Sequence, residues 1–177
     1  LDLGLDYRQL PDNNGLEAIV QLEDGAFVVF AENGRSVQGT LPMWVSRNGV
    51  AEAYRFLPPR NYSPTDAARL PCGDIVVLTR RYSAFEGVSA KLILIEASKI
   101  GTSAILSGRE IAYLEAPLPI DNMEALDIIT LSDDKVRLFM MSDDNFNPVQ
   151  DTLLLVFDWV LPETCRNSSQ TKYATTH

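Results

Sequence analysis

Histidine is almost missing from this sequence: the only one, His177, is the last residue. A Ser-His-Asp triad, a Cys-His pair or a histidine-ligated zinc site therefore cannot be built from this chain alone. The sequence also contains no G-x-S-x-G turn and no G-x-x-x-x-G-K-[ST] phosphate loop. Any catalysis must use carboxylates, arginines, hydroxyl groups or a metal ion held by oxygen ligands.

Basic residues and long apolar runs are scarce as well. The 177 residues include 15 Lys and Arg against 24 Asp and Glu, a formal net charge of −9. This balance argues against nucleic acid and against an anionic membrane surface, because both need a basic footprint, and it favours cations. The apolar runs, such as Leu153 to Phe157, are far shorter than the ~20 residues of a membrane-spanning helix.

The length predicts one domain, and an apolar content of 46% suffices for a core. No signal-peptide pattern opens the chain. Because the sequence starts at Leu1 rather than Met, we expect a signal peptide or a larger upstream piece to be missing. The two cysteines, Cys72 and Cys165, form either one disulfide or two free thiols, and their wide spacing is typical of neither a zinc nor a redox motif.

Short runs of alternating or apolar residues dominate the chain, separated by turns such as Glu23-Asp24-Gly25, Asn48-Gly49 and Pro71-Cys72-Gly73. A period of two is typical of strands, and such turns are typical of hairpins. The expected strands are Leu16–Leu22, Ala26–Ala31, Leu41–Arg47, Val50–Leu57, Thr65–Leu70, Asp74–Arg81, Ala90–Glu96, Arg109–Glu115, Met123–Thr130, Lys135–Ser142 and Thr152–Val160. With one expected helical turn, Glu96–Ile100, the sequence predicts an all-β fold.

Three segments of the chain resemble one another. Each opens with an acidic residue followed by alanine, turns, and closes a second apolar strand on a charged residue. The opening acids are Glu17, Asp66 and Glu124, and the closing residues are Glu32, Arg80 and Asp143. A recurrence of about 50 residues is typical of β-propeller blades with four strands each.

We therefore expect a β-propeller-like fold with about three blades of antiparallel sheet. One blade covers Leu16–Leu57, a second Thr65–Glu115, and a third, with only three strands, Met123–Val160. Leu3–Leu10 would be the outer strand of a preceding blade or would close a ring. Because propellers typically have four to eight blades, we expect the missing blades to come from the upstream chain or from self-association.

The opening acids would lie on the innermost strand of each blade, next to the central channel. Like charges held this close repel, so a cation or protonation must neutralise some of them. Calcium fits, because it accepts six to eight oxygen ligands in flexible geometry. The alternative is that Glu17, Asp66 and Glu124 each cap turn amides or pair with an arginine of their own blade.

The densest polar cluster is Ser142-Asp143-Asp144-Asn145-Phe146-Asn147. It alternates like the start of a calcium loop, but Pro148 and Leu154 stand where an EF-hand needs Gly and Glu. The alternative is an Asx-rich loop that satisfies its own backbone. Asp121 and Asn122 offer further oxygen ligands of the same kind.

The basic residues nearest to these motifs are Arg80, Arg81 and Arg60. An arginine at a strand end can hold a phosphate with two parallel hydrogen bonds. It can equally pair with a neighbouring carboxylate, and the sequence leaves both interpretations open.

The sequence resembles the phytase-like family, described as "esterase-like activity of phytase". The matching motifs are Asn14-Gly15-Leu16-Glu17-Ala18, Ser63-Pro64-Thr65-Asp66-Ala67-Ala68, Leu78-Thr79-Arg80-Arg81-Tyr82-Ser83, Leu118-Pro119-Ile120-Asp121-Asn122-Met123-Glu124-Ala125, Ser142-Asp143-Asp144-Asn145-Phe146-Asn147, Gln150 and Thr152-Leu153-Leu154-Leu155. The chain departs from the family pattern at Met123-Glu124-Ala125 and at Asp151, where an arginine is usual. That departure argues against an anion-facing role at position 151.

The resemblance implies an exported, periplasmic or secreted bacterial propeller that hydrolyses phosphoesters or esters. Family members are usually longer at the N-terminus. Residues 1–161 are accordingly predicted to be an N-terminally incomplete phytase-like propeller domain, and residues 162–177 a polar, disordered tail.

The leading functional hypothesis is calcium-assisted hydrolysis of a small-molecule phosphoester, with Glu124, Arg80 and Arg81 as the catalytic residues. The predicted calcium ligands are Glu17, Asp66, Asp121, Asn122, Glu124, Asp143, Asp144 and Asn145. Metal-bound water would attack phosphorus, while the arginines stabilise the developing charge. The rival hypothesis is a non-catalytic propeller that binds structural calcium and a partner.

Overall fold

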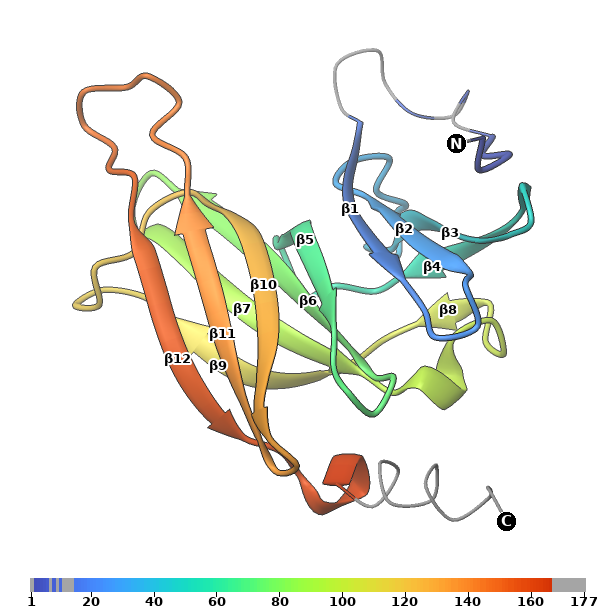
Figure 1. The fold of residues 1–177 in the computed structure, drawn as a ribbon. Helices are drawn as coiled ribbons and strands as arrows, with labels where there is room; N and C mark the ends of the chain where they lie inside the picture. The colour runs from blue at the N-terminus through green and yellow to red at the C-terminus, as the bar shows by residue number, and fades with distance from the viewer. Residues whose placement is uncertain (1, 7, 9, 11–14, 167–177) are drawn as a thin grey trace.

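The computed structural model describes residues 2–6, 8, 10 and 15–166 and consists almost entirely of strands in three sheets (Figure 1). The first sheet contains β1 (Leu16–Gln21), β2 (Phe27–Ala31), β3 (Leu41–Arg47) and β4 (Val50–Phe56), with β8 (Ile105–Leu106) parallel to β4 at its edge. The second contains β5 (Ser63–Arg69), β6 (Ile75–Ser83), β7 (Gly87–Ile95) and β9 (Arg109–Leu114). The third contains β10 (Met123–Ser132), β11 (Lys135–Ser142) and β12 (Leu154–Val160).

The predicted all-β fold and its three blades are confirmed, including the third blade with only three strands. The expected helical turn is the 3-10 helix η1 (Ala97–Lys99). The sequence analysis missed β8, which has two residues and therefore shows no alternation. No strand is present in the described residues of Leu3–Leu10, where one was expected. There, the carbonyl oxygen of Leu3 accepts a hydrogen bond of 2.6 Å from Ser46 Oγ on the first sheet.

Local sequence explains why these strands form hairpins. Between β3 and β4, Asn48 and Gly49 have φ values of 52° and 78°. Two successive left-handed residues make the tight turn whose twist matches that of paired strands, and Asn-Gly adopts it at the lowest cost.

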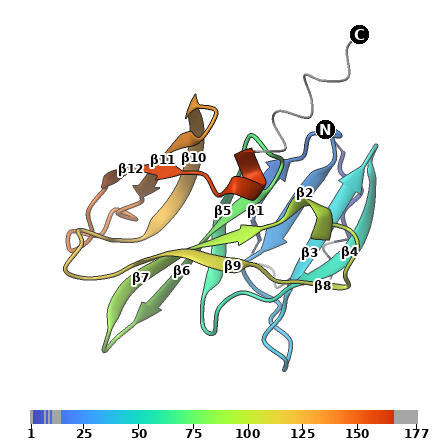
Figure 2. The same cartoon turned by 90° about the horizontal axis from the view of Figure 1, so that it is seen from below.

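The three sheets pack face to face, with β5 lying between β1 and β10 (Figure 2). Phe30 and Phe56 of the first sheet meet edge to face in the core shared with the second sheet. Leu78 of the second sheet belongs with Leu138 and Met140 of the third to another buried cluster. This stacking brings the starts of β1, β5 and β10 to the same end of the molecule (Figure 1).

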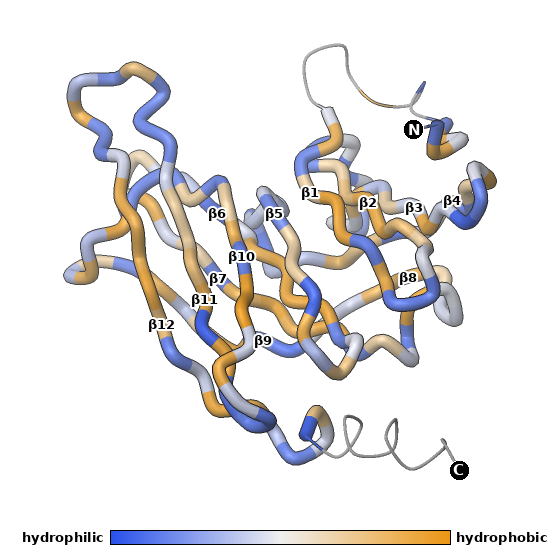
Figure 3. The backbone as a smooth tube through the Cα atoms, viewed as in Figure 1, coloured by the Kyte–Doolittle hydropathy of each residue, from blue (hydrophilic) through white to orange (hydrophobic). Residues whose placement is uncertain are grey.

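One face of the third sheet is not covered by the described residues. Along β12, Leu155, Phe157 and Trp159 pack against the core shared with the second sheet. On the opposite face Leu154, Val156 and Val160 are 62%, 46% and 55% exposed, and Figure 3 shows that β12 is hydrophobic along most of its length. The outer face of the third sheet therefore combines exposed apolar residues with a charged group in which Asp158 pairs with Lys135 and Arg137.

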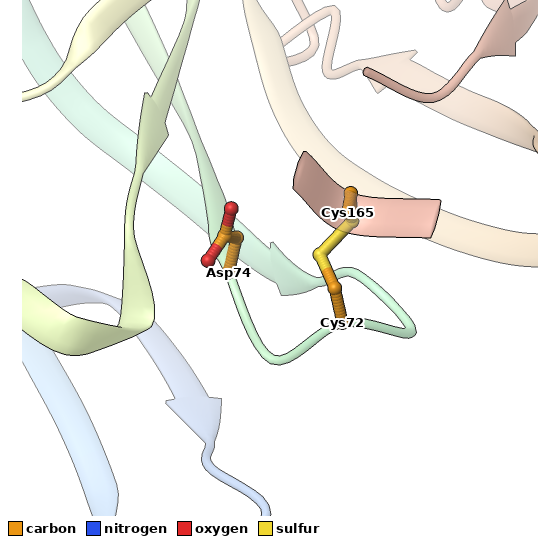
Figure 4. Close-up of side chains that lie close together, drawn as sticks. All are labelled: Cys72, Asp74 and Cys165. Carbon is orange, nitrogen blue, oxygen red and sulfur yellow. A yellow bond between two sulfur atoms is a disulfide. The ribbon is translucent and has the colours of Figure 1, made fainter. Parts of the chain in front are cut away.

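A disulfide joins Cys72, in the turn between β5 and β6, to Cys165 (Figure 4). The sequence left open whether the two cysteines form a disulfide or two free thiols, and the structure contains the disulfide. Cys165 is buried within a helical turn at 163–166, inside the segment predicted to be a disordered tail; residues 167–177 lie outside the described residues. The carboxylate of Asp74 lies beside the bridge and accepts a hydrogen bond from the backbone N–H of Ala97. Bridged sulfurs lack the thiolate charge that a metal ion needs, so this group is structural.

No described helix is both long and apolar enough to cross a membrane.

Candidate functional site

Each innermost strand contains a β-bulge near its start. The register shifts between Leu16 and Ala18 in β1, and between Met123 and Ala125 in β10, so that Glu17 and Glu124 are the extra residues. Bulges of this kind re-aim a side chain, often at a functional site. Both glutamates therefore project from equivalent positions at the same end of their blades.

The predicted equivalence of Asp66 with these two glutamates is wrong by one residue. In β5 the register shifts between Pro64 and Asp66, so that Thr65 is the extra residue. Thr65 Oγ1 donates a hydrogen bond of 2.9 Å to the carbonyl oxygen of Met123. Alignment of the three repeats by sequence places Asp66 opposite Glu17 and Glu124. Alignment of the three backbones at the bulge places Thr65 there instead.

Asp66 instead connects the second blade to the third. Its Oδ2 accepts a hydrogen bond of 2.7 Å from the backbone N–H of Leu126, and its Oδ1 accepts one from Ala67. Burial raises the pKa of Asp66, although these two N–H groups lower it in part. This carboxylate is occupied by backbone donors and holds two blades together.

Four charged residues from three blades form what we call the axial cluster: Glu17, Glu32, Arg80 and Glu124. Nη2 of Arg80 lies 3.1 Å from Oε1 of Glu124. Nε of Arg80 is buried and has no hydrogen-bond partner among the described residues. Three carboxylates around one guanidinium leave the cluster with excess negative charge.

The pKa values of Glu17 and Glu124, the two glutamates at the bulges, are both raised. Burial raises the pKa of Glu17, repulsion by Glu32 and Glu124 raises it further, and Arg80 opposes both effects. Burial also raises the pKa of Glu124, and together with repulsion by Glu32 and Asp143 it outweighs the opposing effects of Arg80 and of a hydrogen bond from Asn122. Carboxyl groups with raised pKa values are suited to donating and accepting protons near neutral pH.

Glu124 is anchored through one of its two oxygens. Oε1 accepts a hydrogen bond of 2.7 Å from Nδ2 of the buried Asn122 and also faces Arg80. Oε2 accepts no hydrogen bond within the described part of the chain. The side chain is thus held in position with one oxygen left for another group.

A pocket of about 550 Å³ adjoins the cluster. Its polar lining includes Arg80, Asp121, Asn122, Asn145 and Gln150, so the fold gathers four of the sequence-predicted site residues around one cavity. This volume is within the usual range for small-molecule sites.

Asp121 organises the wall of this pocket. Its carboxylate accepts hydrogen bonds of 2.8 Å from the backbone N–H groups of Asn122 and Asp151, and one from Nε2 of Gln150. Burial alone would raise the pKa of Asp121, but these three hydrogen bonds outweigh burial and lower it.

The acidic loop after β11 satisfies its own backbone. Oδ1 of Asp143 accepts from the N–H of Asn145, and Oδ1 of Asp144 accepts from the N–H of Phe146. Thr152 Oγ1 donates to the other oxygen of Asp144. These contacts match the Asx-rich alternative that the sequence left open.

The predicted calcium ligands do not converge on one point. Among the described residues, only the group around the disulfide brings three Asp, Glu, His or Cys ligand atoms within 4.8 Å of one another. Calcium therefore stays a prediction.

The two neighbouring arginines have different surroundings. Arg81 pairs with Glu86 at 2.8 Å and lies over the ring of Tyr62, so Arg80 alone belongs to the axial cluster. Sequence analysis did not select Glu32 as a site residue. Its position in the repeat could have identified it. Glu32 directly follows the second strand of the first blade, and Arg80 lies in the last part of the second strand of the second blade.

Comparison with known proteins agrees with this architecture. A profile of the phytase-like family, described as "Esterase-like activity of phytase", matches residues 2–146. No curated protein matches the chain significantly.

Two solved structures of α-L-arabinofuranosidases from Fusarium graminearum are similar in fold. The GH93 enzyme in complex with arabinobiose is 14% identical with a TM-score of 0.57, and the alignment covers 85% of this chain and 48% of the enzyme. A complex with an iminosugar inhibitor is 15% identical with a TM-score of 0.55, and the alignment covers 85% and 47%. These enzymes are β-propellers, which confirms the predicted fold class, and the chain spans about half of their length.

Proposed function

The chain belongs to the phytase-like family, and on this premise we propose that the axial cluster and its adjoining pocket form the active site of a phosphoester hydrolase. The observation that carries the proposal is the environment of Glu124. This glutamate has a raised pKa, is anchored through Oε1 and keeps Oε2 free. A carboxyl group in this state can take up a proton and release it again.

The proposed reaction uses this chain's own residues. A water molecule attacks phosphorus, its oxygen forms the new P–O bond, and Oε2 of Glu124 takes the water proton. The P–O bond to the leaving alcohol breaks, and the same proton passes from Glu124 to the leaving oxygen. The guanidinium of Arg80 offsets the charge that develops on the phosphoryl oxygens. Asn122 holds Glu124 in position through Oε1.

Charge is the main obstacle for a phosphoester at this site. Glu17, Glu32 and Glu124 surround a single arginine, so an anionic substrate is repelled unless a cation intervenes. Calcium held by the predicted ligands, among them Glu124 and Asp143, would supply positive charge and lower the pKa of bound water. The metal enters the proposal for this electrostatic reason.

Glycoside hydrolysis is the second candidate. The axial cluster contains two carboxyl groups with raised pKa values, those of Glu17 and Glu124. Glycosidases use a pair of carboxyl groups of this kind. A neutral sugar is not repelled by the acids. The structural neighbours are α-L-arabinofuranosidases, one of them in complex with arabinobiose.

An assay with three chromogenic substrates tests the proposal: an aryl phosphate, an aryl acetate and an aryl α-L-arabinofuranoside, each with and without Ca²⁺. We expect the chain to hydrolyse the phosphate and Glu124→Gln to lose about 100-fold in rate, which is the usual effect of removing an acid–base group. The control is Glu96→Gln, which removes an exposed acid paired with Lys99 outside the cluster and its pocket.

Each other outcome identifies a different function. Turnover of the arabinofuranoside alone would replace the phosphoester by a glycoside. A folded chain that hydrolyses none of the three substrates would overturn the hydrolase and leave the non-catalytic propeller.

We also propose that further blades cover the outer face of the third sheet and complete the site. The exposed apolar residues of β12 support this, as does a chain that spans about half of each arabinofuranosidase. A longer chain or a second copy would supply these blades.

An exported, periplasmic or secreted location is part of the proposal. The Cys72–Cys165 disulfide supports it, because disulfides persist in oxidising compartments and are rare in the cytosol.

A further inference from the structure

A second pocket, of about 510 Å³, lies between the β2–β3 loop and the β4–β5 loop. Its lining is Arg35, Ser36, Val37, Gln38, Gly39, Leu57, Pro58, Arg60 and Asn61. Two arginines and no acidic residue line it, in a chain with nine more acidic than basic residues. The local charge is therefore opposite to that of the whole chain.

Arg35 is fixed in place without an acidic partner. Nη1 donates a hydrogen bond of 2.9 Å to the carbonyl oxygen of Gly39. Nη2 donates to the carbonyl oxygen of Tyr62 and to Ser63 Oγ. No carboxylate forms an ion pair with Arg35 in the described part of the chain, and burial lowers its pKa. A guanidinium has five N–H donors, so two of them stay unused here.

Arg60 contributes a second unpaired charge to the same pocket. The turn that carries it is closed by a hydrogen bond of 3.0 Å from the N–H of Tyr62 to the carbonyl oxygen of Pro59. The Arg60 guanidinium makes no hydrogen bond or ion pair with any described residue. It is exposed and free to contact a ligand.

The loop opposite Arg60 is rigidly held. Arg55 donates to Thr40 Oγ1 at 2.9 Å and to the carbonyl oxygen of Gly34 at 3.1 Å. The backbone N–H of Ser36 donates a hydrogen bond to the carbonyl oxygen of Thr40, and the hydroxyl groups of the two residues form another. This pocket wall is therefore formed before any ligand arrives, which lowers the entropy cost of binding.

We propose that this pocket binds a tetrahedral oxyanion, such as phosphate or sulfate, between Arg35 and Arg60. Guanidinium groups recognise such anions through charge-assisted hydrogen bonds. The proposal does not depend on the hydrolase, since neither arginine belongs to the axial cluster.

The test is calorimetric titration of the full chain with inorganic phosphate and with sulfate at low ionic strength. We expect saturable binding, about tenfold weaker in Arg60→Gln, as for the loss of a charge-assisted hydrogen bond. Arg60 contacts no described residue, so this substitution leaves the fold intact. The matched control is Arg69→Gln, which removes another exposed arginine at the far end of β5, outside the pocket.

Titration with glycerol phosphate distinguishes a free anion from a phosphate group on a larger molecule. Tighter binding of the ester would assign the pocket to a phosphorylated compound, and tighter binding of inorganic phosphate to the free ion. Absence of saturable binding by the folded chain would overturn the proposal. Equal binding by the wild type and Arg60→Gln would overturn it too.

Discussion

Arg80 and Glu124 pair across the boundary between the second and third blades, with Nη2 and Oε1 3.1 Å apart. Arg80 comes from the end of the second-blade strand β6, and Glu124 from a bulge at the start of the third-blade strand β10. The pair therefore exists only when the two blades are stacked, and it couples the charge of the site to the tertiary structure.

The first prediction concerns this pair. Arg80 lowers the pKa values of Glu124 and Glu17, so Arg80→Gln will raise both further. NMR titration of the side-chain carboxyl carbons measures these values directly. Arg81→Gln is the control, because Arg81 pairs with Glu86 instead, and it should leave both glutamates unchanged. Unaltered glutamate pKa values in a folded Arg80→Gln variant would contradict the pairing.

The second prediction is a pH dependence of stability. A pKa of Glu17 that is higher in the folded than in the unfolded chain means that the folded chain binds the proton more tightly. The resulting stabilisation is present below the ordinary glutamate value and is lost as the pH rises through the raised value. Glu17→Gln removes the repulsion and should be more stable than the wild type at pH 7.

The expected gain is below about 1 kcal/mol, because Glu17 is only partly buried and solvent screens the repulsion. Urea unfolding at pH 3 and pH 7 measures it, and at pH 3 the advantage should disappear. A gain of the same size at both pH values would show that charge is not the cause.

The third prediction concerns the disulfide. Cys72 and Cys165 are 93 residues apart, so opening the bridge releases a long loop in the unfolded chain. Replacing both by serine should lower the free energy of unfolding by about 2–5 kcal/mol. Urea unfolding with and without reductant checks this, since reductant should destabilise the wild type and leave the double variant unaffected. Equal stability of oxidised and reduced wild type would rule out a structural role.

The fourth prediction is calcium binding. Calorimetric titration of the metal-stripped chain should give saturable binding that is lost in Asp143→Asn. Because Asp143 and Asp144 accept hydrogen bonds from their own loop, binding must rearrange that loop, and NMR shifts of its amides should follow the titration. A folded chain without binding would remove the metal from the proposed mechanism.

The fifth prediction tests the outer face of the third sheet. If a second copy covers it, sedimentation will show association that increases with concentration and is weakened by Val156→Lys. Val37→Lys, which changes an exposed valine on a loop of the first sheet, is the control. A wild-type chain that is monomeric at every concentration would exclude the second copy as the source of the missing blades.

The sequence alone determined the strands, the hairpins and the division into three blades. These features depend on local physics: a side-chain period of two, and turn residues such as Asn48-Gly49 that tolerate a left-handed backbone. The order of the motifs also sufficed to identify the family. Arg80, Asp121, Asn122 and Glu124 lie near one another because Asp121, Asn122 and Glu124 come from the start of β10 and its preceding loop, and Arg80 from β6 beside it.

Which charged residues lie together in the axial cluster depends on the tertiary structure. No residue type marks the bulge in these strands, so the sequence could not show that Thr65, rather than Asp66, matches Glu17 and Glu124. Glu32 joins the cluster, and Cys72 reaches Cys165, through the packing of separate blades. Contacts between residues far apart in the chain depend on register and packing, which no local pattern encodes.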